Sequence, residues 1–170
     1  MGQHTDGTIA GNSRQAVNQR SNRSLGPGWK PLIKLKYKHM MPADWSTWSQ
    51  FLASELMRID ELWYDVHVGR PVDMPDDSPE YLIKVAMGVT RKRIDVVVRL
   101  GSELSIIEVK PHANMESVGQ IATYRDLFKK EFEIKGAIKA VIVAKTCDAD
   151  ILETAEQLGV TIYPMDGVVL

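Results

Sequence analysis

The stretch RIDVVVRLGSELSIIEVK, residues 93–110, decides the fold that the sequence predicts. It contains two runs rich in Val and Ile, each typical of a strand, separated by a Gly-Ser dipeptide at positions 101–102. Because glycine at the first of two turn positions suits a type II′ turn, we expect a β-hairpin. This turn would place Asp95 directly opposite Glu108, with Lys110 following on the same face of the sheet.

The two opposed carboxylates of this hairpin would be costly on their own. Their Cβ atoms would lie roughly 4.5–5.5 Å apart, and like charges placed in this way destabilise a hairpin. Either Lys110 offsets the charges or a cation bridges them. Magnesium binds one or two carboxylates, keeps several waters, polarises a phosphoryl oxygen and makes a bound water more acidic. If the turn differed by one residue, Asp95 and Glu108 would instead be diagonal neighbours.

Around the hairpin, the hydrophobic pattern predicts an α/β fold with a central mixed sheet flanked by helices. We expect helices at about 42–59, 78–87, 115–132 and 149–159, and further strands at 61–69, 137–145 and 160–165. Residues 78–87 are also compatible with a strand, and residues 32–38 with either a half-exposed strand or an extended arm. Asp44, Asn114 and Asp148 are the expected helix caps.

Glu55 interrupts the apolar side of the first expected helix. Helical spacing places it between Trp48 and Ile59, on the face that also carries Phe51. A carboxylate that points toward a core needs a partner or a bound cation. The alternative is a slightly rotated helix with Glu55 at the rim of the apolar face.

The composition excludes several classes of protein. Of the 170 residues, 44% are hydrophobic and 25% charged, as in ordinary soluble domains. No apolar run approaches the roughly 18 residues of a membrane span, and the N-terminus lacks the apolar segment of a secretory signal. We therefore expect a cytoplasmic protein without a membrane partner. The single cysteine, Cys147, excludes an internal disulfide and a cluster held by several cysteines.

The charges are distributed unevenly along the chain. Residues 1–38 carry seven basic and one acidic side chains, a balance of +6, whereas the remainder carries 14 basic and 21 acidic ones, a balance of −7. Residues 1–30 hold almost no large apolar side chains, so we interpret them as a flexible basic arm, and residues 31–170 as one domain. The arm would bind a polyanion or an acidic protein assembly, or would be only a solvated tail.

The hairpin and the next helix resemble a known family of nucleases. The stretch 93–110 is similar to the Asp…Glu-x-Lys motif of the PD-(D/E)xK nuclease superfamily, and QIATY, residues 120–124, resembles the Gln-x-x-x-Tyr element of its RecB-like branch. The resemblance covers roughly residues 42–164. It implies a restriction-endonuclease-like αβββαβ core. Ile94 stands where the family motif has proline, and the cysteines of some relatives are missing, so no iron–sulfur cluster is expected.

The resemblance also implies a role for each residue of the motif. Asp95 and Glu108 would bind Mg²⁺ or Mn²⁺ together with the backbone carbonyl of Val109, and Lys110 would be the catalytic lysine. In such nucleases a glutamate from the first core helix often joins the metal site. This points to Glu55, with Glu61 as the alternative.

Further residues would line the cleft or contact the nucleic acid. Gln120 and Tyr124, four residues apart on one side of a helix, would contact metal-bound water or a phosphate. Basic side chains next to the motif would contact phosphates, unless they are only a solvated strand entrance and a loop histidine. These residues are Arg91, Lys92, Arg93 and His112.

The implied function is that of a metal-dependent DNase, a small phage or mobile-element enzyme that processes DNA ends or junctions, in the host cytoplasm if viral. Alternatives within the class are a site-specific restriction-type endonuclease, a junction resolvase and an RNA nuclease. An alternative from another class is a catalytically silent adaptor with the nuclease fold, which binds DNA or a protein assembly through its basic arm. The set of Asp95, Glu108 and Lys110 disfavours the adaptor, because a scaffold has no need of such a costly group of charges.

Overall fold

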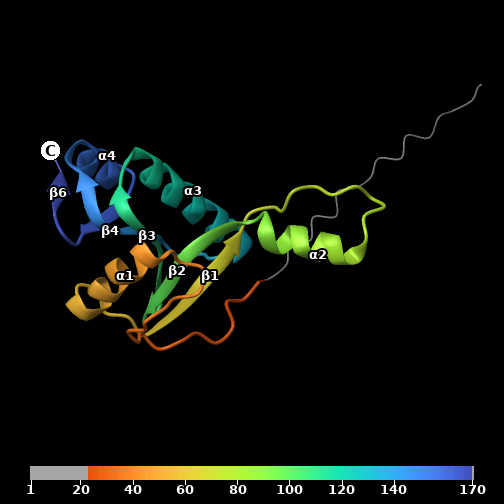
Figure 1. Cartoon of the computed structure of the whole chain (residues 1–170), viewed down its shortest axis with the longest axis horizontal. Helices are drawn as coiled ribbons and strands as arrows, with labels where there is room; N and C mark the ends of the chain where they lie inside the picture. Colours follow the sequence, from red (N-terminus) through yellow and green to blue (C-terminus); the bar gives the residue numbers. More distant parts are fainter. Residues whose placement is uncertain (1–22, 170) are drawn as a thin grey trace, which may run out of the picture.

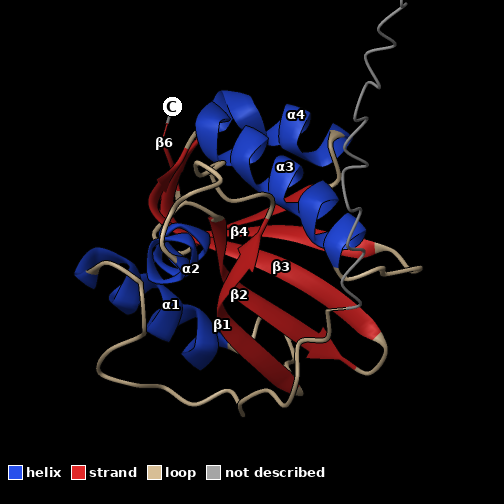
Figure 2. Cartoon of the chain, turned by 90° about the vertical axis from the view of Figure 1, so that its right-hand side faces the viewer, coloured by secondary structure: helices blue, strands red, loops and turns tan. Residues whose placement is uncertain are grey.

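A mixed, open β-sheet with helices on both faces forms the body of the protein (Figures 1 and 2). The computed structural model describes residues 23–169 of the chain. The strands are β1 (Glu61–Val68), β2 (Lys92–Leu100), β3 (Glu103–Ala113), β4 (Ile138–Asp148), β5 (Val160–Pro164) and β6 (Val168–Val169). The helices are α1 (Pro42–Ser54), α2 (Glu80–Val89), α3 (Met115–Glu131) and α4 (Leu152–Gln157), and a 3-10 turn at Ala149–Ile151 precedes α4.

The sheet combines antiparallel and parallel pairing, as the sequence predicts. Its order is β1-β2-β3-β4-β5, and β6 pairs with the end of β4. The pairs β1–β2 and β2–β3 are antiparallel, whereas β3–β4 and β4–β5 are parallel. The structure therefore confirms an α/β fold with a mixed central sheet flanked by helices.

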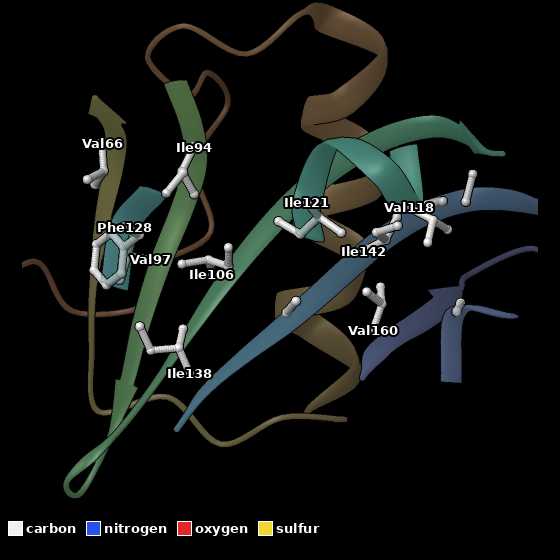
Figure 3. Packing of buried hydrophobic residues seen from close by; sticks show 14 of the residues in the cluster. Val66, Ile94, Val97, Ile106, Val118, Ile121, Phe128, Ile138, Ile142 and Val160 are labelled. Atoms are coloured by element: carbon white, nitrogen blue, oxygen red, sulfur yellow. The ribbon is translucent and has the colours of Figure 1, made fainter. Parts of the chain in front are cut away.

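Two hydrophobic clusters cover the two faces of this sheet. Helices α3 and α4 lie over one face and α1 over the other (Figure 2). The α3 side contains Ile94, Val97, Ile106, Ile121, Phe128 and Ile142, several of which appear in Figure 3. The α1 side contains Tyr37, Trp48, Phe51, Val96, Ile107 and Val143. Strand β4 is apolar on both sides because it is covered on both sides, which explains its uninterrupted run of Val, Ile and Ala.

The β2–β3 hairpin has the register that its two-residue turn predicts. Val96 pairs with Ile107 and Val97 with Ile106, and Gly101 has a φ of 58° that suits the first central position of a type II′ turn. The β2–β3 pairing ends at Val96. Beyond it, β2 stays beside β1 and β3 stays beside β4, so the two strands diverge and form a fork (Figure 3).

Beside the fork, β1 and β2 change the faces to which their side chains point. Residues Tyr64 and Val66 of β1 pair with β2, but no pairing joins Asp65 to Asp95. Ile94 packs on the α3 side of the sheet although Val96, two residues later, packs on the α1 side. Asp65 has a φ of 57°, which a non-glycine residue in a strand rarely adopts and which costs on the order of 1 kcal/mol.

Several elements differ in extent from those the sequence predicts. Helix α1 ends at Ser54 rather than near residue 59, because Glu55 has a left-handed φ of 54°. Helix α2 continues through Gly88 to Val89, and residues 32–38 form no strand. The interpretation of residues 1–30 as a flexible arm falls largely outside the described residues. None of the helices within the described range is long and apolar enough to cross a membrane.

Candidate active site

Glu108 lies at the base of the fork and is almost fully buried. The residue is 2% exposed, although it carries a carboxylate. Its Oε1 accepts a hydrogen bond from Gln120 Nε2 at 2.7 Å and lies 2.9 Å from Lys110 Nζ. Its Oε2 is also buried and has no hydrogen-bond partner within residues 23–169. A buried carboxylate oxygen without a partner is costly, and such exceptions often indicate a missing ion or water.

Asp95 faces the same site from the other strand of the fork. Its Oδ2 accepts a hydrogen bond from the backbone N–H of Val109 at 2.9 Å, so the side chain replaces a main-chain acceptor where the β2–β3 ladder has ended. Burial raises the pKa of Asp95 to about 6, although the Val109 N–H and the charge of Lys110 oppose this shift. Asp95 is thus held in place by the backbone of β3.

The charges of this site act on one another. Burial, and then the negative charge of Asp95, raise the pKa of Glu108 to about 8, and Lys110 and Gln120 offset this only in part. Burial alone would lower the pKa of Lys110, but the charges of Glu108 and Asp95 outweigh it and raise that pKa. Lys110 is therefore an ammonium ion at neutral pH, placed beside two carboxyls.

Helix α3 supplies the opposite side of the site. The helix begins at Met115, where the side chain of Asn114 accepts a hydrogen bond from the Ser117 N–H at 3.1 Å and caps it as predicted. Gln120 donates both to Glu108 and, at 3.2 Å, to the hydroxyl of Tyr124. Because the Tyr124 hydroxyl accepts this bond, its own proton is free to be donated to a substrate oxygen.

Helix α1 contributes Asp44, a residue expected from the sequence only to cap this helix. Its Oδ2 accepts a long hydrogen bond of 3.3 Å from the Met41 N–H, as a residue of the first turn can. Its Oδ1 is buried and has no hydrogen-bond partner among the residues described. Burial raises the pKa of Asp44 against the charge of Lys110, and the charge of Asp44 in turn helps to raise the pKa of Asp95.

The two glutamates proposed to complete the metal site lie elsewhere. Glu55 is exposed at the C-terminus of α1, about 16 Å along the helix axis from Asp44. Glu61 forms an ion pair with Arg99 and accepts a hydrogen bond from the Gly28 N–H at 2.7 Å. The Arg99 hydrogen bond lowers the pKa of Glu61. Of the two placements considered for Glu55, the one on the buried face was wrong, because the helix ends one residue before it.

The four residues expected to contact nucleic acid are scattered. Arg91 is buried, donates to the carbonyls of Gly69 and His67 at 2.8 and 3.1 Å, and forms an ion pair with Glu131. Its guanidinium thus holds the fold together. His112 lies beside the end of β4, with Nδ1 2.8 Å from Thr146 Oγ1 and Nε2 2.8 Å from Asp148 Oδ1.

Arg93 belongs to a polar network around Asp65. It donates to His39 Nδ1 at 2.9 Å and to the carbonyl of Gly88 at 3.1 Å. His39 and His67 place their Nε2 atoms 3.0 and 3.4 Å from Asp65 Oδ2, so these contacts hold Asp65 in its left-handed conformation. The charge of Asp65 also helps to raise the pKa of Asp95. Lys92, between Arg91 and Arg93, is exposed.

The donor set fits a hard divalent cation that keeps much of its water. Two carboxyls share the fork, and each of Glu108 and Asp44 has a buried oxygen without a hydrogen-bond partner in the described structure. No group of three or more His, Cys, Asp and Glu side chains within residues 23–169 is placed to hold a metal ion. Magnesium does not require such a cage, since one or two carboxylates with water and substrate oxygens suffice.

Comparisons with known proteins give no assignment. No family model, no curated protein and no solved structure matches the chain.

Proposed function

We propose that the protein is a Mg²⁺- or Mn²⁺-dependent nuclease of the PD-(D/E)xK type that hydrolyses phosphodiester bonds in DNA. The observation that carries this proposal is the buried Glu108 carboxyl, which faces Asp95 and Lys110 in the fork and has one oxygen without a partner among residues 23–169. A structural ion pair alone does not account for this arrangement, since one ammonium stands against two carboxyls.

The fold is compatible with a restriction-endonuclease-like core. One helix, three antiparallel strands, a helix and a parallel strand follow one another as α1, β1, β2, β3, α3 and β4, with α2 inserted after β1. This order agrees with the αβββαβ arrangement that the sequence resemblance implies, and the motif residues lie where β2 and β3 diverge. The finer assignment to this fold family is part of the proposal.

Asp95 and Glu108 would hold the metal ion, with the backbone carbonyl of Val109 as a further ligand and Asp44 close by. The ion would supply Lewis-acid chemistry, polarising the phosphate and lowering the pKa of a water molecule. Hydrolysis adds water across one P–O bond, so the products are a phosphate monoester and a free hydroxyl. Asp44 thus takes the role that the family resemblance implied for Glu55.

The remaining residues would bind and orient the phosphate. Lys110 carries a full positive charge and would stabilise the negative charge that accumulates on the phosphoryl oxygens. Gln120 holds Oε1 of Glu108, which leaves Oε2 for the cation. Tyr124 would donate its hydroxyl proton to a phosphate oxygen, because its acceptor position is taken by Gln120.

Cleavage assays on defined substrates test the proposal. Linear duplex, single-stranded, circular and branched DNA, and an RNA of matched length, are incubated with Mg²⁺, Mn²⁺ or a chelator. We expect cleavage of DNA that requires the metal, and a loss of at least about 100-fold in rate for Asp95→Asn and Lys110→Met.

Glu103→Gln is the matched control. Glu103 lies on β3, like Glu108 and Lys110, but its carboxylate is exposed and pairs with Lys139 at 2.6 Å. The variant should cleave like the wild type. If the wild type cleaves no substrate with any metal, or if Asp95→Asn cleaves equally well, the proposal is wrong. DNA binding without cleavage would support the alternative of an adaptor with the nuclease fold.

A further inference from the structure

Residues 29–39, which precede α1, form a basic surface along the edge of the sheet. The segment reads WKPLIKLKYKH and carries four lysines, Lys30, Lys34, Lys36 and Lys38, but no acidic residue. All four lysines are exposed. Within residues 23–169, no carboxylate forms an ion pair with Lys34, Lys36 or Lys38. The described part of the chain therefore leaves the positive charge of this surface uncompensated.

The segment is fixed to the body of the protein, although most of its side chains are exposed. Trp29 and Leu62 exchange both of their backbone hydrogen bonds, at 2.8 and 2.9 Å, so the segment begins beside the start of β1. The side chain of Tyr37 is buried in the α1-side cluster, and its hydroxyl accepts a hydrogen bond from the Lys34 N–H at 3.0 Å. The basic surface thus has a defined position on the fold.

The other end of the segment lies beside the candidate active site. His39 Nε2 lies 3.0 Å from Asp65 Oδ2, and Asp65 is close enough to Asp95 for its charge to raise the pKa of that residue. The ammonium of Lys36 lies 5.8 Å from the ring centre of Trp45, in the first turn of α1. The segment, orange in Figure 1, therefore follows β1 from its start to the fork.

Apolar side chains are exposed between these lysines. Trp29, Leu32, Ile33 and Leu35 are 63%, 61%, 60% and 98% exposed. The ammonium of Lys34 lies over the Trp29 ring, 5.3 Å from its centre, which holds the ring in place and still leaves most of it accessible. Proteins bind single-stranded nucleic acids with this combination, because bases stack on the aromatic rings and a positively charged groove follows the phosphates.

We propose that residues 29–39 bind a single strand of DNA and lead it to the fork, with a base stacked on Trp29 and phosphates beside Lys34 and Lys36. The inference rests on the proposed nuclease function and adds the form of DNA that the site receives. A duplex would use the lysines but would leave Trp29 in water, because its bases are already stacked on one another.

The contacts of the lysines favour a nucleic acid over an anionic membrane. A membrane surface would attract the same charges and would bury the exposed apolar side chains. The ammonium groups of Lys34 and Lys36, however, lie against the rings of Trp29 and Trp45. Insertion of these rings among acyl chains would bury the two charges with them, which is costly. A DNA strand places its phosphates and bases side by side and so matches both kinds of group.

Fluorescence anisotropy of a labelled oligo(dT) of about 20 nucleotides tests the proposal, in a chelator that prevents metal-dependent cleavage. The wild type should bind it more tightly than a duplex of the same length. The double variant Lys34→Gln/Lys36→Gln should lower the slope of log Kd against log salt by about 1.4, because each phosphate contact with a single strand contributes about 0.7. Lys129→Gln/Lys130→Gln is the matched control, since both lysines are exposed on α3, over the other face of the sheet.

Trp29→Ala separates stacking from charge. It should raise the Kd for oligo(dT) at least about fivefold and leave the salt slope and the Kd for the duplex unchanged. Tyr81→Ala is the control, because it removes a ring on α2 that is 65% exposed. Circular dichroism should show both variants folded, since Trp29 is joined to β1 through its backbone.

Several results would overturn the proposal. They are equal affinity for oligo(dT) and the duplex, an unchanged salt slope in Lys34→Gln/Lys36→Gln, and unchanged binding of oligo(dT) by Trp29→Ala. Binding to vesicles of phosphatidylcholine and phosphatidylserine in equal parts, without binding to DNA, would overturn it in favour of a membrane surface. Failure of the nuclease proposal looks different, because oligo(dT) would then bind as expected but would not be cleaved with any metal.

Discussion

Glu108 is the residue of the candidate site whose ionised form is the most costly in free energy. It is buried, lies beside Asp95, and has a single ammonium, that of Lys110, to compensate for two carboxyls. In the absence of a cation, the cheapest state of this group is the protonated one, because protonation removes both the burial cost and the repulsion. The protein should therefore reveal the site through its stability as well as through its activity.

The first prediction concerns pH. The folded pKa of Glu108 is about 8 and its ordinary value 4.5, so the folded state binds more protons between these values. The stability that this proton provides is complete below about pH 4.5 and is lost as the pH rises through 8. Asp95, with a pKa of about 6, acts in the same direction. In the presence of a chelator, the free energy of unfolding of the wild type should therefore fall as the pH rises. Glu108→Gln should remove most of this fall, on the order of 2 kcal/mol.

Urea unfolding at about pH 5 and pH 8.5 measures this difference. Glu103→Gln serves as the control, because its carboxylate is exposed, and it should keep the pH dependence of the wild type. An equal pH dependence in Glu108→Gln and the wild type would contradict the assigned burial cost.

The second prediction concerns Lys110. Replacing it by methionine keeps the length of the side chain and removes the charge that stands against the phosphate. We expect the cleavage rate to fall about 100-fold or more, while Mn²⁺ binding persists because both carboxyls remain. Lys145→Met, on the neighbouring strand β4 and paired with Asp166 at 3.7 Å, should leave the rate unchanged. A loss of metal binding in Lys110→Met would indicate that the lysine organises the site rather than acting on the phosphate.

The third prediction separates Asp44 from Glu55. Asp44→Asn removes a charge beside Asp95 and Lys110, so cleavage should require about tenfold more Mg²⁺. Glu55→Gln changes an exposed residue at the other end of α1 and should have no effect. The magnesium dependence of the cleavage rate, measured for both variants, gives the answer. The reverse result would restore the sequence-based assignment.

At the scale of the elements, the hairpin could be predicted because its turn fixes every pairing in it. Two residues at 101–102 determine the register, and Val96 meets Ile107 as expected. Gln120 and Tyr124 lie on the capped helix beside Glu108 as expected. Asp95 and Glu108 lie near each other, but they are not a paired position, because the β2–β3 pairing ends at Val96 and Asp95 binds the Val109 N–H instead. Local sequence was sufficient where short-range geometry decides the outcome.

The residues that were misplaced depend on contacts that the sequence does not reveal. The position of Glu55 around the helix was derived by assuming that the helix continues past it, but α1 ends at Ser54. Arg91 was expected to contact a phosphate or to be solvated, but it is buried and pairs with Glu131, 40 positions later in the chain, which only the fold brings close to it. Arg125 of α3 likewise makes a contact that the sequence does not reveal, since it donates to the carbonyl of Gly159 at 3.1 Å beyond the end of α4.

The fourth prediction follows from Arg91. It is the most buried arginine of the described ion pairs, and it joins the end of β1 to α3 through Gly69 and Glu131. Arg91→Met should lower the free energy of unfolding by about 3 kcal/mol, because the carbonyls of Gly69 and His67 lose this donor and Glu131 keeps, among residues 23–169, only the more exposed Arg23 and the Gly69 N–H. Lys139→Met breaks an exposed pair and should cost less than about 1 kcal/mol. Chemical denaturation of both variants gives the two changes in the free energy of unfolding, and so distinguishes a buried ion pair from an exposed one.

At the scale of the whole molecule, the architecture separates two surfaces. The fork between β2 and β3 gathers Asp95, Glu108 and Lys110 under α3 and beside the start of α1. Helix α2, inserted after β1, extends away from the sheet and leaves Tyr81, Val85 and Val89 exposed.

Binding of Mn²⁺ by the folded protein, followed by electron paramagnetic resonance of the free ion, tests the central claim most directly. The wild type should take up Mn²⁺ at the fork, and Asp95→Asn and Glu108→Gln should each weaken this uptake at least tenfold. Glu103→Gln should bind like the wild type. Equal uptake by all four proteins, or none by the wild type, would contradict a metal site formed by Asp95 and Glu108.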